Sequence, residues 1–323
     1  MWINRMRPYG WLPVVVLLLG CALARPALAQ CPGAQALPDY QGKPIKLLEN
    51  TLLFRTDILQ HDVDGSPRAY GVRDQGTEFV CNGLAPIRPA HCARSSNRGA
   101  ECARACREAF ARWSRSGLPP QRLNDTMVSI GLGGGSSSRI AARLQPPPNE
   151  AWFVSETSVK LAPPAGPVTP GWIDRQEAQL DPGAIRYFVI PGRFRAAAWD
   201  ATPGDAGYVL DAATGIGSYF IIGDTGGALD EGSTALLTAL RNGAAPPMGQ
   251  DTSALGETVQ RYTAGIRGDF RVAIFRHSST SDPRQRTQLT LKQGEVEGWS
   301  RGVAEARLAA LGGNQRLLDC TKP

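Results

Sequence analysis

Short apolar runs separated by glycine- and proline-rich turns dominate the pattern of this chain. Tyr219–Ile222 and Ile185–Ile190 are rich in aromatic and β-branched residues, and each run stops at a glycine or proline turn. Further strands are expected at Thr51–Phe54, Ala151–Lys160, Tyr208–Leu210 and Phe270–Phe275. Many short strands joined by such turns are typical of a closed β core. We therefore predict a mainly β, α+β fold built on a barrel.

Three segments show helical periodicity instead. Ala100–Ser116 gathers two cysteines and two aromatic side chains on one face. Glu295–Leu311 carries an apolar stripe and ends at a pair of glycines. Thr234–Leu240 is a short apolar segment that Asn242-Gly243 would end. We expect helices at all three places.

The order of these elements predicts one domain after a leader. Residues 50–250 are expected to form the barrel core, with a cysteine-rich helical insertion at 78–117 that disulfides hold in place. Gln30–Glu49 looks irregular, and residues 251–323 are expected to form a C-terminal strand–helix extension. One domain with insertions accommodates a mature length of about 290 residues. We therefore expect a single domain over residues 30–323.

The first 29 residues have the features of a signal peptide. Arg5 and Arg7 precede the apolar stretch Leu12–Gly20, and Ala27-Leu28-Ala29 offers a cleavage site. The stretch is shorter than a membrane-spanning helix requires, and no later segment reaches that length. Its end is also similar to a lipobox, so lipid anchoring at Cys21 stays open. We expect a secreted or periplasmic protein without a membrane span.

Charge and motif content argue against several classes of function. Loss of three arginines with the leader lowers the formal net charge from +6 to +3, and the basic residues are scattered, so no nucleic acid partner is expected. The three histidines, His61, His91 and His277, occur without a G-x-S-x-G motif, which argues against a serine hydrolase. The glycine-serine loop Gly131–Ser138 lacks the ending of a phosphate-binding loop. No cofactor is therefore expected.

Cysteine usage agrees with export. Six cysteines follow the leader, namely Cys31, Cys81, Cys92, Cys102, Cys106 and Cys320. An even number in an oxidising compartment indicates up to three disulfides, whose pairing the sequence leaves open. The alternative is a zinc site that combines Cys102 and Cys106 with His91-Cys92. We favour disulfides and expect no metal.

Two carboxylates flank a glycine-rich loop in the second half of the chain. Asp224 follows the strand at Tyr219–Ile222, Gly226-Gly227 permits a tight turn, and Glu231 precedes the helix at Thr234–Leu240. A pair of carboxylates on a rigid scaffold is what cleavage of a glycosidic bond requires. The structural alternative is that Asp224 caps the turn and Glu231 caps the helix.

A second polar turn holds Asp62 and Asp64 before Gly65. Their spacing is similar to the opening of a calcium loop, but Gln60 occupies the position of the first carboxylate and the final glutamate is missing. An aspartate-rich turn is therefore favoured. Asp62, Asp64 and Asp205 either order turns or line a groove.

Several motifs occur in a fixed order along the chain. They are Asp62–Tyr70, Tyr187–Pro191, Gly204-Asp205 and the stretch from Gly223-Asp224 to Glu231-Gly232-Ser233. This order resembles glycoside hydrolase family 75, the fungal-type chitosanases and their bacterial relatives, over Asn50 to Leu240 with gaps. The resemblance implies that Asp224 and Glu231 are the essential carboxylates. Asp230 stands where the family has a glycine, and the intervening loop is shorter than in the fungal enzymes.

A shorter stretch has a second likeness. Asp224–Ala228 is similar to the Asp-x-Gly-Gly signature of double-psi β-barrels in membrane-bound lytic transglycosylases, where the aspartate is the catalytic acid at a barrel groove. This likeness implies a double-psi-like β-barrel core. It also implies that Asp224 lies where a sugar would bind.

The resemblances imply an exported glycoside hydrolase that cleaves β-1,4 linkages of an amino-sugar polysaccharide. Family 75 enzymes invert, so one carboxyl protonates the leaving oxygen while the other, about 6.5–9.5 Å away, activates water. Asp224 is expected to be the acid, because an apolar strand precedes it, and Glu231 the base. Candidate substrate-binding residues are Asp62, Asp64, Asp205 and Thr225.

Two other functions stay open at this point. A lytic transglycosylase-like enzyme acting on peptidoglycan would use Asp224 nearly alone, and a non-catalytic carbohydrate-binding protein would keep only the scaffold. The mildly basic chain argues against chitosan, because a polycationic substrate favours an acidic cleft. We expect a monomer whose partner is a polysaccharide.

Overall fold

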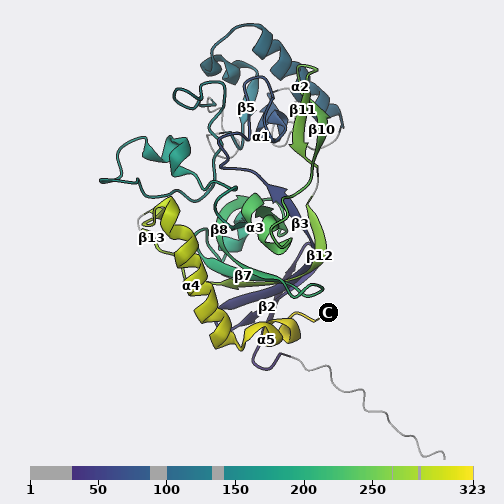
Figure 1. Ribbon diagram of the computed structural model, residues 1–323, viewed down its shortest axis with the longest axis vertical. Coiled ribbons are helices and arrows are strands. Elements are labelled where there is room, and N and C mark those ends of the chain that lie inside the picture. Colours follow the sequence, from purple (N-terminus) through teal and green to yellow (C-terminus); the bar gives the residue numbers. More distant parts are fainter. Residues whose placement is uncertain (1–30, 88–99, 133–141, 264, 283–284, 323) are drawn as a thin grey trace, which may run out of the picture.

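One mixed sheet of eight strands forms the lower half of the molecule in this computed structural model (Figure 1). The structure describes residues 31–87, 100–132, 142–263, 265–282 and 285–322. The predicted signal peptide (1–29) and the candidates Cys21, His91 and Cys92 lie outside these residues. No helix in the described ranges is long and apolar enough to cross a bilayer.

Six strands of this sheet close into a barrel. The eight strands are β1 (Gln35–Tyr40), β2 (Lys43–Leu48), β3 (Thr51–Asp62), β6 (Tyr187–Pro191), β7 (Ala206–Asp211), β8 (Gly217–Gly226), β9 (Glu231–Ser233) and β12 (Ile266–Phe275). The ring runs β3-β12-β7-β8-β6-β9 and returns to β3. Its β3–β9 and β6–β8 pairings are parallel, unlike the all-antiparallel pairings of an up-and-down barrel. The predicted mainly β barrel is confirmed, and this mixed pairing agrees with a double-psi-like core.

Aromatic side chains fill the barrel. Phe54, Phe188 and Phe220 are fully buried, and the rings of Phe188 and Phe220 stack with centroids 5.0 Å apart. Burial of each such ring stabilises the fold by about 2–3 kcal/mol. Helix α3 (Thr234–Leu240) closes one side of this core through three buried leucines. The helix predicted at these residues is confirmed.

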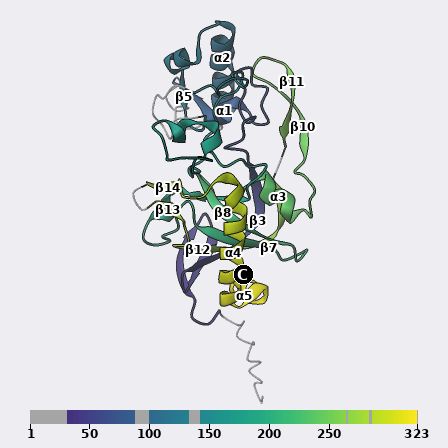
Figure 2. The ribbon, with the colours of Figure 1, turned by 60° about the vertical axis from the view of Figure 1, so that its left-hand side comes forward.

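A second lobe with its own core lies above the barrel (Figures 1 and 2). Its elements are α1 (Val80–Gly83), β4 (Leu84–Pro86), α2 (Ala100–Arg115), the 3₁₀ helix η2 (Pro120–Asp125), β5 (Met127–Ser129) and the hairpin of β10 (Met248–Thr252) with β11 (Thr258–Tyr262). Phe110 and Trp113 of α2 pack against Phe153. The predicted helix is confirmed, but the lobe takes in far more of the chain than residues 78–117.

Two expectations about the ends of the core are wrong. Gln30–Glu49, expected to be irregular, forms β1 and β2, which extend the sheet from β3. Phe270–Phe275, expected in a C-terminal extension, belongs to β12, which pairs with both β3 and β7 inside the barrel. Prolines 246 and 247 interrupt regular secondary structure, and for this reason the core was predicted to end there. A local interruption does not determine which distant strands pair later in the chain. The barrel therefore uses residues on both sides of that break.

The segment Ala151–Lys160 is not the predicted strand. It makes isolated bridges at Trp152, Phe153 and Lys160, each to a different segment. The segment crosses from the upper lobe to the barrel, so no single strand runs beside it for its whole length. Its backbone is held by loops and side chains instead.

The C-terminal part of the chain packs on the outside of the barrel. Helix α4 (Gln293–Leu311), confirmed where a helix was predicted, lies along β7 and β8, and α5 (Gly313–Cys320) follows. The two short strands β13 (Ser281–Asp282) and β14 (Gln285–Leu289) directly precede α4 in the chain. Three 3₁₀ helices occur earlier, namely η3 (Trp172–Asp174), η4 (Gln176–Ala178) and η5 (Gly192–Arg195).

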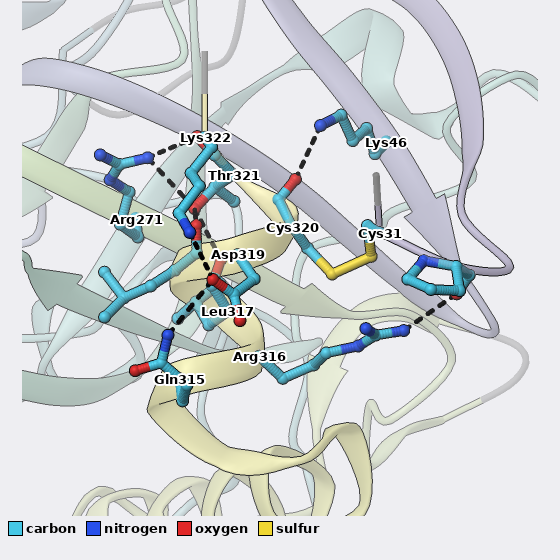
Figure 3. The surroundings of a disulfide bond; sticks show 12 residues. Cys31, Lys46, Arg271, Gln315, Arg316, Leu317, Asp319, Cys320, Thr321 and Lys322 are labelled. Atoms are coloured by element: carbon cyan, nitrogen blue, oxygen red, sulfur yellow. Dashed lines mark hydrogen bonds and ion pairs between the residues drawn. A yellow bond between two sulfur atoms is a disulfide. The ribbon is translucent and has the colours of Figure 1, made fainter. Parts of the chain in front are cut away.

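The barrel and the upper lobe each contain a disulfide bond. Cys31–Cys320 joins the two ends of the fold, where Lys46 Nζ also donates to the Cys320 carbonyl at 2.9 Å (Figure 3). Cys81–Cys106 pins α2 to α1 in the upper lobe. Cys102 is disulfide-bonded as well, so every cysteine in the described ranges is oxidised.

Candidate active site

A cavity of about 310 Å³ opens where the barrel meets the upper lobe. The barrel contributes Asp224 and Glu231, and Tyr70 comes from the lobe. Asp62, the last residue of β3, and Asp64, in the turn that follows, complete a set of four carboxylates. Among the described residues that line this cavity there is no lysine or arginine. The cavity wall is therefore acidic, although the chain as a whole is basic.

The register of three neighbouring strands brings Asp224 and Glu231 together. Val189 of β6 pairs with Asp224 of β8 on one side and with Glu231 of β9 on the other. The two Cα atoms are thus separated by two strand spacings, about 10 Å. The parallel pairing of β9 with β3 then places Asp62 close to Glu231. Non-local pairing, rather than the loop between the two carboxylates, sets this geometry.

The Asp224 carboxylate is held by hydrogen bonds on one oxygen. Its Oδ1 accepts from the Ser158 backbone N–H at 2.8 Å, from Ser158 Oγ at 2.6 Å and from the Thr225 N–H at 2.7 Å. Burial raises the pKa of Asp224, while these donors and the nearby Lys160 ammonium act in the opposite direction. Asp224 thus binds a neighbouring segment and does not simply cap the glycine turn.

Glu231 has a different environment. Burial, together with the charges of Asp230 and Asp224, raises the pKa of Glu231 to about 7. No hydrogen bond from the described part of the chain reaches its carboxylate. A Cβ atom on Gly226 would lie 2.7 Å from Glu231 Oε2, so the glycine leaves room for this carboxylate.

Glu231 does not cap the following helix. The cap of α3 is Ser233, whose Oγ accepts a hydrogen bond from the Leu236 N–H. The structural alternative for Glu231 is therefore wrong. Its side chain lines the cavity instead.

Asp62 and Asp64 share a tightly bonded turn. Asp62 Oδ1 accepts from the Asp64 N–H at 2.8 Å, and Asp64 Oδ1 accepts from Tyr70 Oη at 2.7 Å and from Ser155 Oγ at 3.2 Å. Burial raises the pKa of both carboxyls well above the usual range, and neighbouring carboxylates, Asp224 among them, add to this. The two residues both order the turn and line the cavity.

Asp205, a third candidate for substrate binding, lies elsewhere. It is fully buried and accepts hydrogen bonds from Thr202, Ser278 and Ser279. These bonds join the loop before β7 to the loop after β12, so Asp205 orders turns and does not line the cavity. Thr225, the fourth candidate, does line it.

Three residues at the site were not predicted as site residues. Ser158 lies in a segment expected to be a regular strand, and Tyr70 in a turn motif. His61 also lines the cavity, and its Nε2 lies 2.6 Å from Thr234 Oγ1. Burial lowers the pKa of His61 to about 4, so the imidazole is neutral at neutral pH. Only the folding of distant segments reveals these positions.

The fold and the site together define a closed, mixed β-barrel with a carboxylate-lined cavity at the junction with a second lobe. A scan against protein-family models finds no match for this chain. A search of curated protein sequences finds no match either.

Proposed function

We propose that this protein is an exported glycoside hydrolase that cleaves β-1,4 linkages of an amino-sugar polysaccharide of the chitosan type. The observation that carries the proposal is the placement of Asp224 and Glu231 on the two strands that flank β6, both lining one cavity. Inverting hydrolysis needs one carboxyl that holds a proton and one that stays ionised. Two carboxyls with different surroundings meet this need.

The hydrogen bonds favour Glu231 as the general acid and Asp224 as the general base. Glu231, with a pKa of about 7 and no donor to its carboxylate from the described residues, keeps a proton for the leaving oxygen in mildly acidic solution. The ionised form of Asp224 is stabilised by Ser158 and Thr225, which suits a base that activates water. This division is the reverse of the one expected from the sequence, where the apolar strand before Asp224 favoured that residue as the acid.

The charge of the cavity favours a cationic substrate. Four carboxyl groups and no described lysine or arginine line it, and an ammonium group of a deacetylated amino sugar bound there would favour their ionised forms, which burial alone disfavours. A carboxylate of peptidoglycan would find no described lysine or arginine in this lining to pair with. The basic composition of the whole chain is therefore no argument against a polycationic substrate, because the residues that line the cavity are acidic.

The first test is a substrate panel. The mature protein is incubated with chitosan, chitin oligomers and peptidoglycan, and the products are analysed by mass spectrometry and a reducing-end assay. We expect shorter chains with ordinary reducing ends from chitosan. Anhydro-sugar products from peptidoglycan would support a lytic transglycosylase instead. Binding without cleavage of any polymer would support a non-catalytic carbohydrate-binding protein.

The second test separates the acid from the base. Asp224→Asn and Glu231→Gln should each lower kcat by about 10²–10⁴-fold. A substrate with an activated leaving group needs no general acid, so it should restore turnover to Glu231→Gln and not to Asp224→Asn. Glu305→Gln, which changes an exposed carboxylate on α4, is the matched control and should keep full activity. Full turnover in both site variants would refute this pair.

The disulfides support activity outside the cytoplasm. Every described cysteine is disulfide-bonded, and oxidising compartments favour such bonds. We propose a secreted or periplasmic monomer. Cell fractionation and size-exclusion chromatography of the native protein test location and oligomeric state separately.

A further inference from the structure

The segment at residues 157–160 lies against strand β8 at the candidate site. The Val159 N–H donates to the Gly223 carbonyl at 3.0 Å. This contact brings the preceding residue, Ser158, to the carboxylate of Asp224. Ser158 itself is not among the described residues that line the cavity, so it lies behind Asp224 and not beside a bound substrate.

Ser158 forms a short hydrogen-bonded chain with Thr225 and Asp224. Ser158 Oγ lies 2.6 Å from Asp224 Oδ1 and 2.7 Å from Thr225 Oγ1. A hydroxyl has one proton, so when Ser158 donates to Asp224, Thr225 must donate to Ser158. The backbone N–H groups of both residues also donate to the same carboxylate oxygen. Asp224 Oδ2 accepts no hydrogen bond from the described part of the chain.

Lys160 adds a half-buried positive charge near the same carboxylate. Its Nζ donates to the Thr157 carbonyl and to Gln179 Oε1, each at 2.6 Å. These two bonds fix the ammonium in place. Its charge acts on Asp224 in the direction that favours the ionised carboxylate.

The other titratable groups around Asp224 act against ionisation. Asp62, Asp64 and Glu231 interact with it as like charges when they are ionised. The Tyr187 phenol also lies near it, and burial keeps this phenol neutral by raising its pKa. Burial favours the neutral carboxyl as well. Ser158, the Thr225 N–H and Lys160 are therefore needed to offset these effects.

We infer that Ser158 and Lys160 are positioning residues, which hold Oδ1 of Asp224, keep this carboxylate ionised and leave Oδ2 to bind the attacking water. As a statement about catalysis, this inference rests on the proposed function. In that reaction the water oxygen bonds to the anomeric carbon and gives its proton to Asp224 Oδ2. The bond from that carbon to the leaving oxygen breaks, and this oxygen takes the proton of Glu231.

The first experiment is the pH profile of kcat/KM for Ser158→Ala on the polymer that the wild type cleaves. Loss of a charge-assisted hydrogen bond should move the acid limb of the profile to higher pH by about one pH unit. We expect kcat to fall more than KM rises. Ser158→Thr keeps the hydroxyl and should restore the position of the limb. Ser300→Ala, which removes a buried hydroxyl on α4, should leave the profile unchanged.

Lys160→Met provides an independent variant. It removes the charge but keeps a side chain of similar length, and it should move the acid limb in the same direction. Thermal melting checks that each variant is folded. An unmoved acid limb in folded Ser158→Ala and Lys160→Met would overturn the inference, even if the wild type is an active hydrolase.

A readout without substrate separates this inference from the proposed function. The carboxyl of Asp224 is titrated by ¹³C NMR, with its signal identified by comparison with Asp224→Asn. The midpoint should rise in Ser158→Ala and in Lys160→Met, and should stay in place in Ser300→Ala. If the wild type cleaves no polymer but the midpoint rises, the proposed function fails and the positioning of Asp224 stands. If the midpoint does not move, the positioning fails.

Discussion

At the scale of single residues, the two candidate carboxylates differ in what surrounds them. Asp224 Oδ1 accepts three hydrogen bonds, whereas Glu231 lies against the bare backbone of Gly226. The two carboxyl groups therefore differ in their affinity for a proton, although their chemistry is the same. The distance between the two residues along the sequence contains no information about this difference.

Substitution of Gly226 by alanine tests the position of the Glu231 carboxylate. A methyl group at Gly226 would meet Glu231 Oε2 at 2.7 Å and Val189 Cγ1 at 3.0 Å, so Gly226→Ala should displace the carboxylate. If Glu231 is the proposed general acid, we expect a loss of about 10-fold or more in kcat, because small misplacements of a catalytic group are costly. Gly192→Ala, directly after β6, is the matched control, since a methyl group there meets nothing within 4 Å and Gly192 is not among the described residues that line the cavity. Equal activity of the two variants would contradict the described position of Glu231.

The raised pKa of Glu231 predicts how stability depends on pH. Its folded-state pKa of about 7 exceeds the ordinary value of 4.5, so the folded protein binds an extra proton between these pH values. This contribution is complete below pH 4.5 and is lost as the pH rises through 7, by about 3 kcal/mol in the free energy of unfolding. Urea unfolding of the wild type and of Glu231→Gln over this range measures the difference. A constant difference between the two proteins would contradict the raised pKa.

At the scale of elements, β9 and α3 form one unit that carries Glu231. Ser233 ends β9 and caps α3, and its Oγ also accepts a hydrogen bond from the Tyr187 N–H of β6 at 3.0 Å. One buried hydroxyl thus joins a strand, a helix and the neighbouring strand. The local sequence predicted the helix correctly, while the link to β6 depends on the closed barrel.

Ser233→Ala tests the contribution of the two hydrogen bonds that Ser233 Oγ accepts. The substitution leaves the Tyr187 and Leu236 N–H groups without their acceptor inside the protein, which should cost about 2 kcal/mol of stability. Ser300→Ala removes one hydroxyl that donates to the Glu297 carbonyl in α4, so it should cost less than half as much. Chemical denaturation of both variants provides the comparison. Equal losses of stability in the two variants would show that the Ser233 hydrogen bonds contribute no more than the single one of Ser300.

At the scale of the whole molecule, the cavity exists because two lobes meet. The β10–β11 hairpin links them: Arg261 lies 2.9 Å from Asp74 in the upper lobe, and the ring of Tyr262 contacts that of His61 in the barrel. Arg261 is 4% exposed and Asp74 is fully buried, so this ion pair is almost free of solvent. The hairpin therefore fixes the upper lobe beside the barrel.

Arg261→Met should loosen the upper lobe. It leaves the buried Asp74 carboxylate without its counter-charge, a change that costs about 3–5 kcal/mol. Hydrogen exchange should increase in α1 and in the hairpin while β12 and β7 stay protected. The exposed Arg267 of β12 supplies the control, since Arg267→Met should change neither property. The double variant Asp74→Asn/Arg261→Met should recover part of the lost stability, because no buried charge remains.

The sequence by itself determined the local features of this protein. Apolar runs and turn residues predicted the strands at Tyr219–Ile222 and Ile185–Ile190, the helices at α2, α3 and α4, and the disulfide bonding. These features depend on residues near one another in the chain. Asp224 and Glu231 were also predicted as a pair of candidate residues from their place at the ends of predicted elements, and the structure places both in the lining of one cavity.

Only the tertiary structure decided how these parts combine. The return of β12 to the barrel, the pairing of β9 with β3 and the placement of Ser158 behind Asp224 all join residues far apart in the chain. Asp205, similar to Asp224 in its motif, became a turn residue because its oxygens meet the loop at Ser278 and Ser279. Proton affinity and local charge arise from such non-local neighbours, which a linear pattern of residue types does not contain.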